Sequence, residues 1–138
     1  AMLKDFTKII HKFVEANKDN AAMQEFVAPL AAANKEWGDI TMQIGMRAMQ
    51  NPDEVGAAAV DYLYFAGYVT LAYLWARMAL VAQEKLAEGT TDVDFYNAKI
   101  TTARFYFKKI LPRVRSHVDV IATGVEPLMS LDAEHFAF

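Results

Sequence analysis

Apolar residues recur along most of this chain at the three-to-four-residue spacing of amphipathic α-helices. A first apolar stripe, with lysines on the opposite side, predicts a short helix from Leu3 to Val14. A second stripe predicts a longer helix from about Ala21 to Gln50, kinked near Pro29 because proline removes a backbone donor. The polar residues 17–20 interrupt the pattern and separate the two helices.

The most apolar stretch of the chain runs from Glu54 to Leu86. It has no proline, and its apolar residues fall on every side of the helical period, so it predicts one long helix buried nearly all round. Its uncharged run, from Tyr62 to Ala76, is shorter than the roughly 18–20 apolar residues of a transmembrane helix and includes several tyrosines. A core helix is therefore favoured over a membrane span. Its small residues Ala72, Ala76 and Ala79 predict close approach of a neighbouring helix.

Local signals mark both ends of this central helix. The segment Asn51-Pro52-Asp53-Glu54 combines an N-cap residue, a proline at the first helical position and two acids that complement the positive helix start. At the other end, Gly89 suits the left-handed residue that follows a helix.

Thr91 or Asp92 is then expected to cap a fourth helix. Its apolar stripe continues beyond Pro112, which is expected to bend the helix without ending it, and Gly124 closes it. The stripe comprises Val93, Tyr96, Ile100, Ala103, Phe107, Ile110, Val114, Val118 and Ile121. Together the four segments predict an all-α fold, an up-and-down bundle of about four helices forming a single domain over residues 1–138.

Composition narrows the class of protein. Hydrophobic residues make up 54% of the chain, above the usual share of about 45–50%, which indicates a dense core or a surface made for a partner. A net charge of −3 argues against a nucleic-acid binder. The absence of cysteine excludes disulfides and thiolate chemistry and fits the cytoplasm. The start, Ala1-Met2, shows no signal peptide and suggests a tag scar, so an excised domain is expected.

No catalytic, cofactor or metal constellation is visible. A di-iron bundle needs Glu-x-x-His pairs, and none occurs. The histidines His11, His117 and His135 lie on different segments without an acid at that spacing, so surface or helix-end positions are expected for them. Glycine-rich phosphate loops, G-x-S-x-G elbows and zinc-binding His-Glu-x-x-His motifs are also missing.

Two charged features remain. Asp61 lies in the apolar helix and would need a partner, with Arg104, Lys99 or Arg77 as candidates; a structural ion pair or an exposed position is favoured over a proton-handling role. No acid occurs between Phe95 and Val118, where a solvated helix face is favoured over a docking face for an acidic partner or ligand phosphates. The basic residues of this possible docking face are Lys99, Arg104, Lys108, Lys109, Arg113 and Arg115.

Several segments together resemble one known family. They are Asn51-Pro-Asp-Glu-Val-Gly-Ala-Ala-Ala, Asp61-Tyr-Leu, Gly67-Tyr-Val, Leu74-Trp-Ala-Arg-Met-Ala79, Phe95-Tyr-Asn-Ala-Lys, Thr102-Ala-Arg-Phe-Tyr-Phe107, Leu111-Pro112 and the terminal Leu128-Met-Ser-Leu-Asp-Ala-Glu-His-Phe136. The chain resembles the C-terminal helical domain of FAD-dependent acyl-CoA dehydrogenases, in a branch that includes enzymes similar to 3-methylmercaptopropionyl-CoA dehydrogenase. The resemblance covers most of residues 51–138 and, more loosely, the first fifty.

This resemblance implies a parent oxidoreductase of fatty acid metabolism that oxidises the Cα–Cβ bond of acyl-CoA thioesters. A glutamate base would remove the α-proton while hydride passes to the flavin, and electrons would leave through an electron-transfer flavoprotein. The FAD and the catalytic residues would belong to upstream domains of the same chain, so none is expected in this fragment. The fragment would be an accessory bundle, packed on those catalytic domains or across the interface of a homo-oligomer.

Two other classes of function stay open. One is an independent, non-enzymatic helical interaction or oligomerisation module. The other is a bundle attached peripherally to a membrane without a transmembrane segment.

Overall fold

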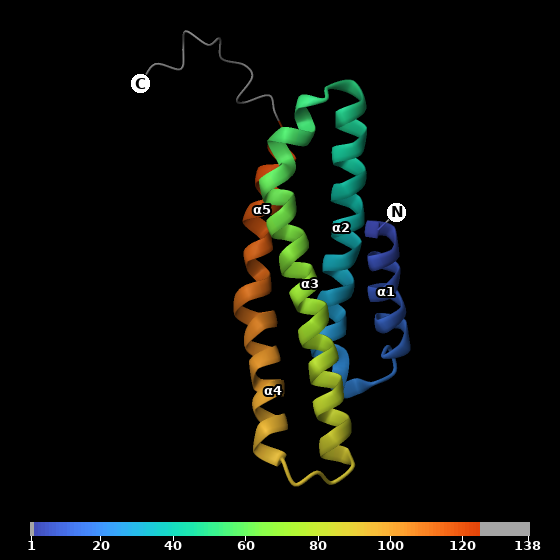
Figure 1. Cartoon of the computed structure of the whole chain (residues 1–138), viewed down its shortest axis with the longest axis vertical. Helices are drawn as coiled ribbons and strands as arrows, with labels where there is room; N and C mark the ends of the chain where they lie inside the picture. Colours follow the sequence, from blue (N-terminus) through green and yellow to red (C-terminus); the bar gives the residue numbers. More distant parts are fainter. Residues whose placement is uncertain (1, 125–138) are drawn as a thin grey trace, which may run out of the picture.

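Four helical rods lie side by side in the computed structural model, which describes the backbone of residues 2–124 and the side chains of residues 5–124 (Figure 1). In chain order the elements are α1 (Met2–Ala16), the 3₁₀ turn η1 (Ala21–Met23), α2 (Gln24–Gln50), α3 (Asp53–Ala87), α4 (Val93–Phe105), the π-helical turn η2 (Tyr106–Ile110), the 3₁₀ turn η3 (Leu111–Arg113) and α5 (Val114–Thr123). The all-α, up-and-down bundle of about four helices is confirmed. The terminal segment 128–136 and His135 lie outside the described residues.

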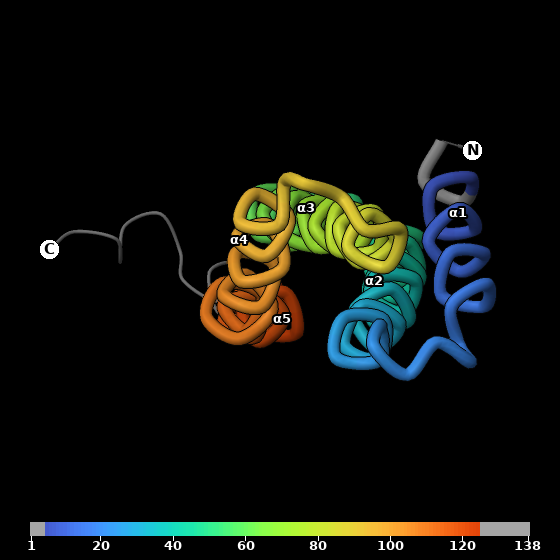
Figure 2. The backbone as a smooth tube through the Cα atoms, turned by 90° about the horizontal axis from the view of Figure 1, so that it is seen from below, coloured from blue at the N-terminus to red at the C-terminus, as the bar shows by residue number. Residues whose placement is uncertain are grey.

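α3 is the central element of the bundle. It packs against α2 on one side and against α4 and α5 on the other, while α1 lies along α2 (Figure 2). The core between these helices contains large side chains that are fully buried: Ile10, Met23, Phe26, Val27, Leu30, Phe65 and Val69. Ala72, Ala76 and Ala79 are 0% exposed, so other parts of the bundle cover α3 at these small residues; the close approach of a neighbouring helix stays a prediction.

α3 begins and ends close to the predicted residues. The first helical residue is Asp53, so Pro52 and not Asn51 occupies the N-cap position, but the side-chain oxygen of Asn51 still accepts a hydrogen bond from the Asp53 amide at 3.1 Å. After the helix, Gly89 adopts a positive φ of 84°. The Thr90 amide donates to the Lys85 carbonyl and the Gly89 amide to the Leu86 carbonyl, each at 3.2 Å, which is the Schellman pattern.

The rod formed by α4 and α5 continues past Pro112, as predicted, but through two irregular turns. Pro112 has no amide hydrogen, and the chain around it forms η2 and η3 in place of a regular α-helix. The Leu111 amide bonds to the Tyr106 carbonyl five residues earlier. The wider turn places the neighbouring side chains of Tyr106 and Phe107 both in the core. Gly124, with φ of 67°, ends the helix as predicted.

Smaller differences concern helix starts. The first residues of the predicted second helix form η1, and α2 proper begins at Gln24 and continues through Pro29. Asp92 precedes α4, but its side chain makes no capping hydrogen bond. Val93 was predicted to lie in the apolar stripe, and it is 45% exposed because it belongs to the first turn, beside the loop.

The prediction that the central helix is buried nearly all round is wrong. Val60, Leu63 and Leu71 are exposed by 64%, 70% and 48%. The rods form an open arc in which α3 lies between α2 and the rod of α4 and α5 (Figure 2). These neighbours cover only part of the circumference of α3. The apolar composition of α3 therefore exceeds what the described core buries.

By length and composition, α3 is also the one described helix that could cross a membrane, and 39% of its most apolar window is buried. Core helices of soluble proteins meet the same criterion. The sequence-based preference for a core helix over a membrane span stays a prediction.

Candidate functional site

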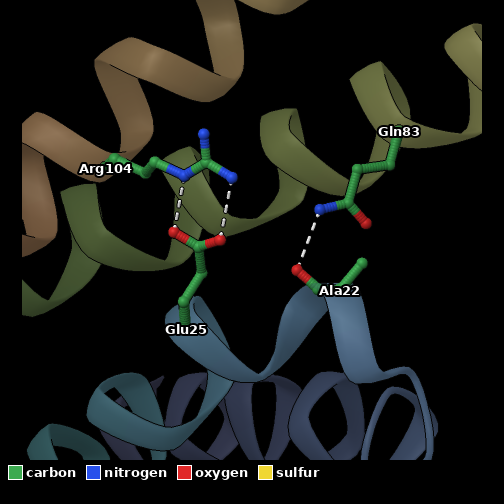
Figure 3. A network of polar contacts seen from close by, with 4 residues as sticks. All are labelled: Ala22, Glu25, Gln83 and Arg104. Carbon is green, nitrogen blue, oxygen red and sulfur yellow. Dashed lines mark hydrogen bonds and ion pairs between the residues drawn. The ribbon is translucent and has the colours of Figure 1, made fainter.

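Arg104, one of the six basic residues predicted as a docking face, is engaged within the bundle (Figure 3). Its Nε donates to Glu25 Oε1 at 2.7 Å and its Nη2 to Glu25 Oε2 at 3.0 Å, so the two planar groups pair at both positions. Hydrogen bonding to Glu25 raises the pKa of Arg104. The pair joins α4 to the start of α2. Beside it, the Gln83 amide donates to the Ala22 carbonyl at 3.0 Å and fixes α3 to η1.

Arg115 repeats this arrangement on α5. Its two terminal nitrogens donate to the two carboxylate oxygens of Glu36 on α2, each at 3.0 Å, and this hydrogen bonding raises the pKa of Arg115. Lys108, Lys109 and Arg113 are exposed, and no ion pair is described for them. Two of the six basic residues thus stabilise the packing of α2 on the opposite rod. A docking role for the whole set stays a prediction.

Asp61 does not pair with any of the three cations predicted for it. Its Oδ1 lies 2.8 Å from Nδ1 of His117 on α5, and the two side chains are 24% and 20% exposed. Arg104 is bound to Glu25, while Arg77 on α3 is sixteen residues further along, about 24 Å at 1.5 Å per residue. Lys99 lies over the ring of Phe95. The expected surface or helix-end position of His117 is also wrong.

A signal for the Asp61–His117 contact was present in the sequence. The two residues lie equally far from Gly89, which ends α3 at the turn before α4. In a pair of antiparallel helices, residues equally distant from the connecting turn lie side by side. Tyr68 and Tyr106, which are 21 and 17 residues from Gly89, are also in contact, so the register is shifted by about one turn there.

The surroundings of this pair favour a structural role. The Tyr64 ring stacks on the imidazole at 5.1 Å with an interplanar angle of 9°, and the Tyr68 ring lies 5.8 Å away. Aromatic rings thus cover the imidazole beside the carboxylate. No group of three or more potential metal ligands occurs among the described residues. We therefore interpret the pair as a polar connection between α3 and α5.

Double-mutant cycles should rank the two kinds of polar pair. For Asp61→Ala and His117→Ala we expect a coupling free energy of about 1.5 kcal/mol or more, because the two side chains are only 24% and 20% exposed and removing one leaves the other without its hydrogen-bond partner. For Arg104→Ala and Glu25→Ala, whose side chains are 49% and 39% exposed, we expect less than about 1 kcal/mol. Urea unfolding at neutral pH measures both, and the reverse order would contradict this interpretation.

A feature that the sequence analysis missed is an apolar face on the outer side of α3. It is formed by Val60, Tyr64, Leu71, Leu74, Met78 and Val81, exposed by 36–64%, and is called the α3 apolar face below. Two grooves adjoin it. One, of about 430 Å³, lies against α2 and is lined by Ile44, Val55 and Leu63 among others. The other, of about 470 Å³, lies against α4, with Phe95, Arg77 and Lys99 at its edge.

The comparisons with known proteins agree with one another on the class of protein that this chain resembles. The family model described as "Acetyl-CoA dehydrogenase C-terminal like" matches residues 6–132. The chain is 30% identical over 135 residues to "Broad-specificity linear acyl-CoA dehydrogenase FadE5" of Mycobacterium tuberculosis, an alignment that covers 92% of this chain and 22% of that protein. It is 32% identical over 115 residues to "Butyryl-CoA dehydrogenase" of Syntrophomonas wolfei, covering 81% of this chain and 19% of that protein. The chain thus spans about a fifth of the length of these relatives.

Proposed function

Because this chain belongs to the acetyl-CoA dehydrogenase C-terminal like family, we propose that it is the C-terminal accessory domain of an FAD-dependent acyl-CoA dehydrogenase. The observation that carries the proposal is the coverage: most of this chain aligns with about a fifth of two acyl-CoA dehydrogenases. The parent enzyme would oxidise the Cα–Cβ bond of acyl-CoA thioesters. The finer branch, with enzymes similar to 3-methylmercaptopropionyl-CoA dehydrogenase, stays a prediction from the sequence segments.

In this proposal the FAD and the catalytic residues belong to the rest of the parent enzyme. None of the turns between the described helices is a glycine-rich loop of the kind that holds a pyrophosphate at a helix start, which supports this placement of the FAD. The groove against α2 presents mainly apolar surface, and the groove against α4 combines apolar side chains with Arg77 and Lys99. These observations support a domain that positions or stabilises the catalytic part.

The wider setting of the parent enzyme follows from the same proposal. It would act in fatty acid metabolism in the cytoplasm, as a homo-oligomer that transfers its electrons to an electron-transfer flavoprotein. No contact with nucleic acid is proposed, in keeping with the net charge of −3. The acyl chain length of the substrate depends on residues outside this chain.

The test compares the parent enzyme with the 138-residue chain. We expect the purified parent to carry flavin absorbance and to reduce an electron-accepting dye when acyl-CoA is added, whereas the isolated chain does neither. A parent protein without flavin would reject this class of enzyme. Stoichiometric flavin on the isolated chain would reject the placement of the cofactor in other domains.

The exposed α3 apolar face also fits the alternative function, an independent helical interaction module. An antibody against the bundle separates the two functions in a blot of cell extract. A band near 15.5 kDa would favour the interaction module, and a band several times larger would favour the dehydrogenase domain.

A further inference from the structure

The α3 apolar face has the sequence pattern of a helix-packing seam. With Gly67, its residues follow one another in alternating steps of four and three, the heptad spacing by which one helix packs along another. None of them is charged. Gly67 itself is exposed, and a Cβ added there would meet nothing within 4 Å. A second helix could therefore approach the backbone of α3 closely at this point.

The size of the surface is appropriate for a stable contact. Together with Leu63 and Phe95 at its edges, the α3 apolar face presents on the order of 800 Å², more than the roughly 300–600 Å² of the largest patch on a typical monomer. It is close to the roughly 800 Å² that each partner contributes to a standard interface.

Two cations at the edge of the α3 apolar face restrict the kind of segment that could bind there. Arg77 lies 5.7 Å from the centre of the Tyr73 ring, and Lys99 lies 5.0 Å from the centre of the Phe95 ring. Neither cation has a carboxylate partner among the described residues. Both border the groove formed with Leu74, Met78 and Val81. An occupant with an apolar stripe and acidic residues toward these two cations would satisfy both features.

A second copy of this chain matches that charge pattern poorly. Pairing of two α3 helices about a two-fold axis near Leu71 would place Arg77 opposite position 65 of the other copy. The nearest carboxylate there, Asp61, is already bound to His117. Within such an α3 pair, Arg77 would therefore meet no free carboxylate among the described residues of the other α3.

We propose that an amphipathic, acidic helix from the part of the parent polypeptide outside residues 1–138 covers the α3 apolar face. This inference rests on the proposed function. About four fifths of the length of the relatives lies outside the part that aligns with this chain. A helix tethered in the same polypeptide has an effective concentration in the millimolar range. A contact of the size of the α3 apolar face therefore suffices to hold the bundle on the rest of the enzyme.

Photo-crosslinking in the parent enzyme tests the occupant. A photoreactive phenylalanine analogue replaces Leu71 in the seam or, as the control, Met42 on α2, which is 67% exposed outside the seam. Peptide mass spectrometry on a mixture of isotope-labelled and unlabelled protein distinguishes contacts within one chain from contacts between copies. We expect position 71 to link to an acidic peptide of the same chain, with at least tenfold less product from position 42.

Other outcomes overturn the inference. Links between labelled and unlabelled chains would identify a second copy, links to added lipid vesicles would identify a membrane, and equal yields from both positions would show that nothing specific covers the seam. Flavin content and acyl-CoA oxidation are measured on the same preparation. If the parent contains flavin and oxidises acyl-CoA but position 71 links elsewhere, only this docking is rejected. If position 71 links within the same chain but the parent contains no flavin, only the proposed enzyme class is rejected.

Charge reversal gives a second, independent test. Arg77→Glu combined with Lys99→Glu should increase the rate at which a protease releases the bundle from the parent by about tenfold or more. Lys108→Glu combined with Lys109→Glu is the matched control, since these two lysines are exposed outside the groove. As isolated 138-residue chains, the Lys108 and Lys109 variant should melt like wild type, and the Arg77 and Lys99 variant should melt only slightly lower, through loss of the contacts with the Tyr73 and Phe95 rings. Equal release from both variants of the parent would contradict the acidic occupant.

Discussion

Replacing Phe26 with alanine is expected to lower the free energy of unfolding by about 3–5 kcal/mol. Phe26 is 0% exposed on α2, and its ring lies 5.6 Å from that of Phe107 in η2 at an angle of 61°. The substitution would open a cavity between α2 and the opposite rod and remove this edge-on aromatic contact. Because domains of this size are stable by about 5–15 kcal/mol, urea unfolding followed by circular dichroism should show a clearly lower midpoint.

Phe105→Ala is the matched control for this prediction. Phe105 lies two residues before Phe107, but it is 57% exposed, so we expect its loss to change stability by less than about 0.5 kcal/mol. Similar losses from the two variants would contradict the described packing, because they would mean that burial does not distinguish the two rings.

Helix boundaries were predictable because they depend on a few neighbouring residues. Asn51 supplies its side-chain oxygen to an amide two residues later, and Gly89 supplies a positive φ that other residues disfavour. The passage through Pro112 was predicted only in outline. The apolar stripe resumes after the proline, but the pattern does not say that a π-turn precedes it and places both Tyr106 and Phe107 inside.

Burial of α3 was not predictable from its composition, because an apolar residue looks the same in the sequence whether this bundle or another segment covers it. Leu71 and Phe65 are both apolar, yet one is 48% exposed and the other 0%. The excess of apolar residues did indicate a partner surface as one explanation, without giving its location. The heptad spacing on the outer side of α3 becomes visible only when the buried residues are known.

Side-chain pairing was the least predictable feature of the bundle. Asp61 was expected to need a partner, which is correct, but cations were considered only by charge and not by position along the paired helices. The basic stretch likewise looked uniform, although Arg104 and Arg115 meet glutamates that are distant in the sequence. Such contacts depend on the register of the helices, which local patterns do not determine.

The hydroxyl of Tyr106 should make the stability of the bundle depend on alkaline pH. Tyr106 is 6% exposed, and its hydroxyl donates to the backbone carbonyl of Tyr68. Burial, with a smaller contribution from the Tyr68 side chain, raises the pKa of Tyr106 well above its ordinary value near 10. The folded chain therefore keeps this proton at a pH where the unfolded chain has lost it.

The sign follows from this difference in bound protons. Stability from the neutral hydroxyl is fully present below pH 10 and falls as the pH rises toward the raised pKa of the folded chain, by about 1.4 kcal/mol at pH 11 while the folded hydroxyl stays protonated. Tyr106→Phe should cost about 1 kcal/mol at pH 8 through the lost hydrogen bond. At pH 11 this cost should disappear, because the variant has no hydroxyl to ionise on unfolding. Urea unfolding of both proteins at the two pH values measures the effect, and a cost that does not change with pH would show that Tyr106 ionises equally in the folded and unfolded chain.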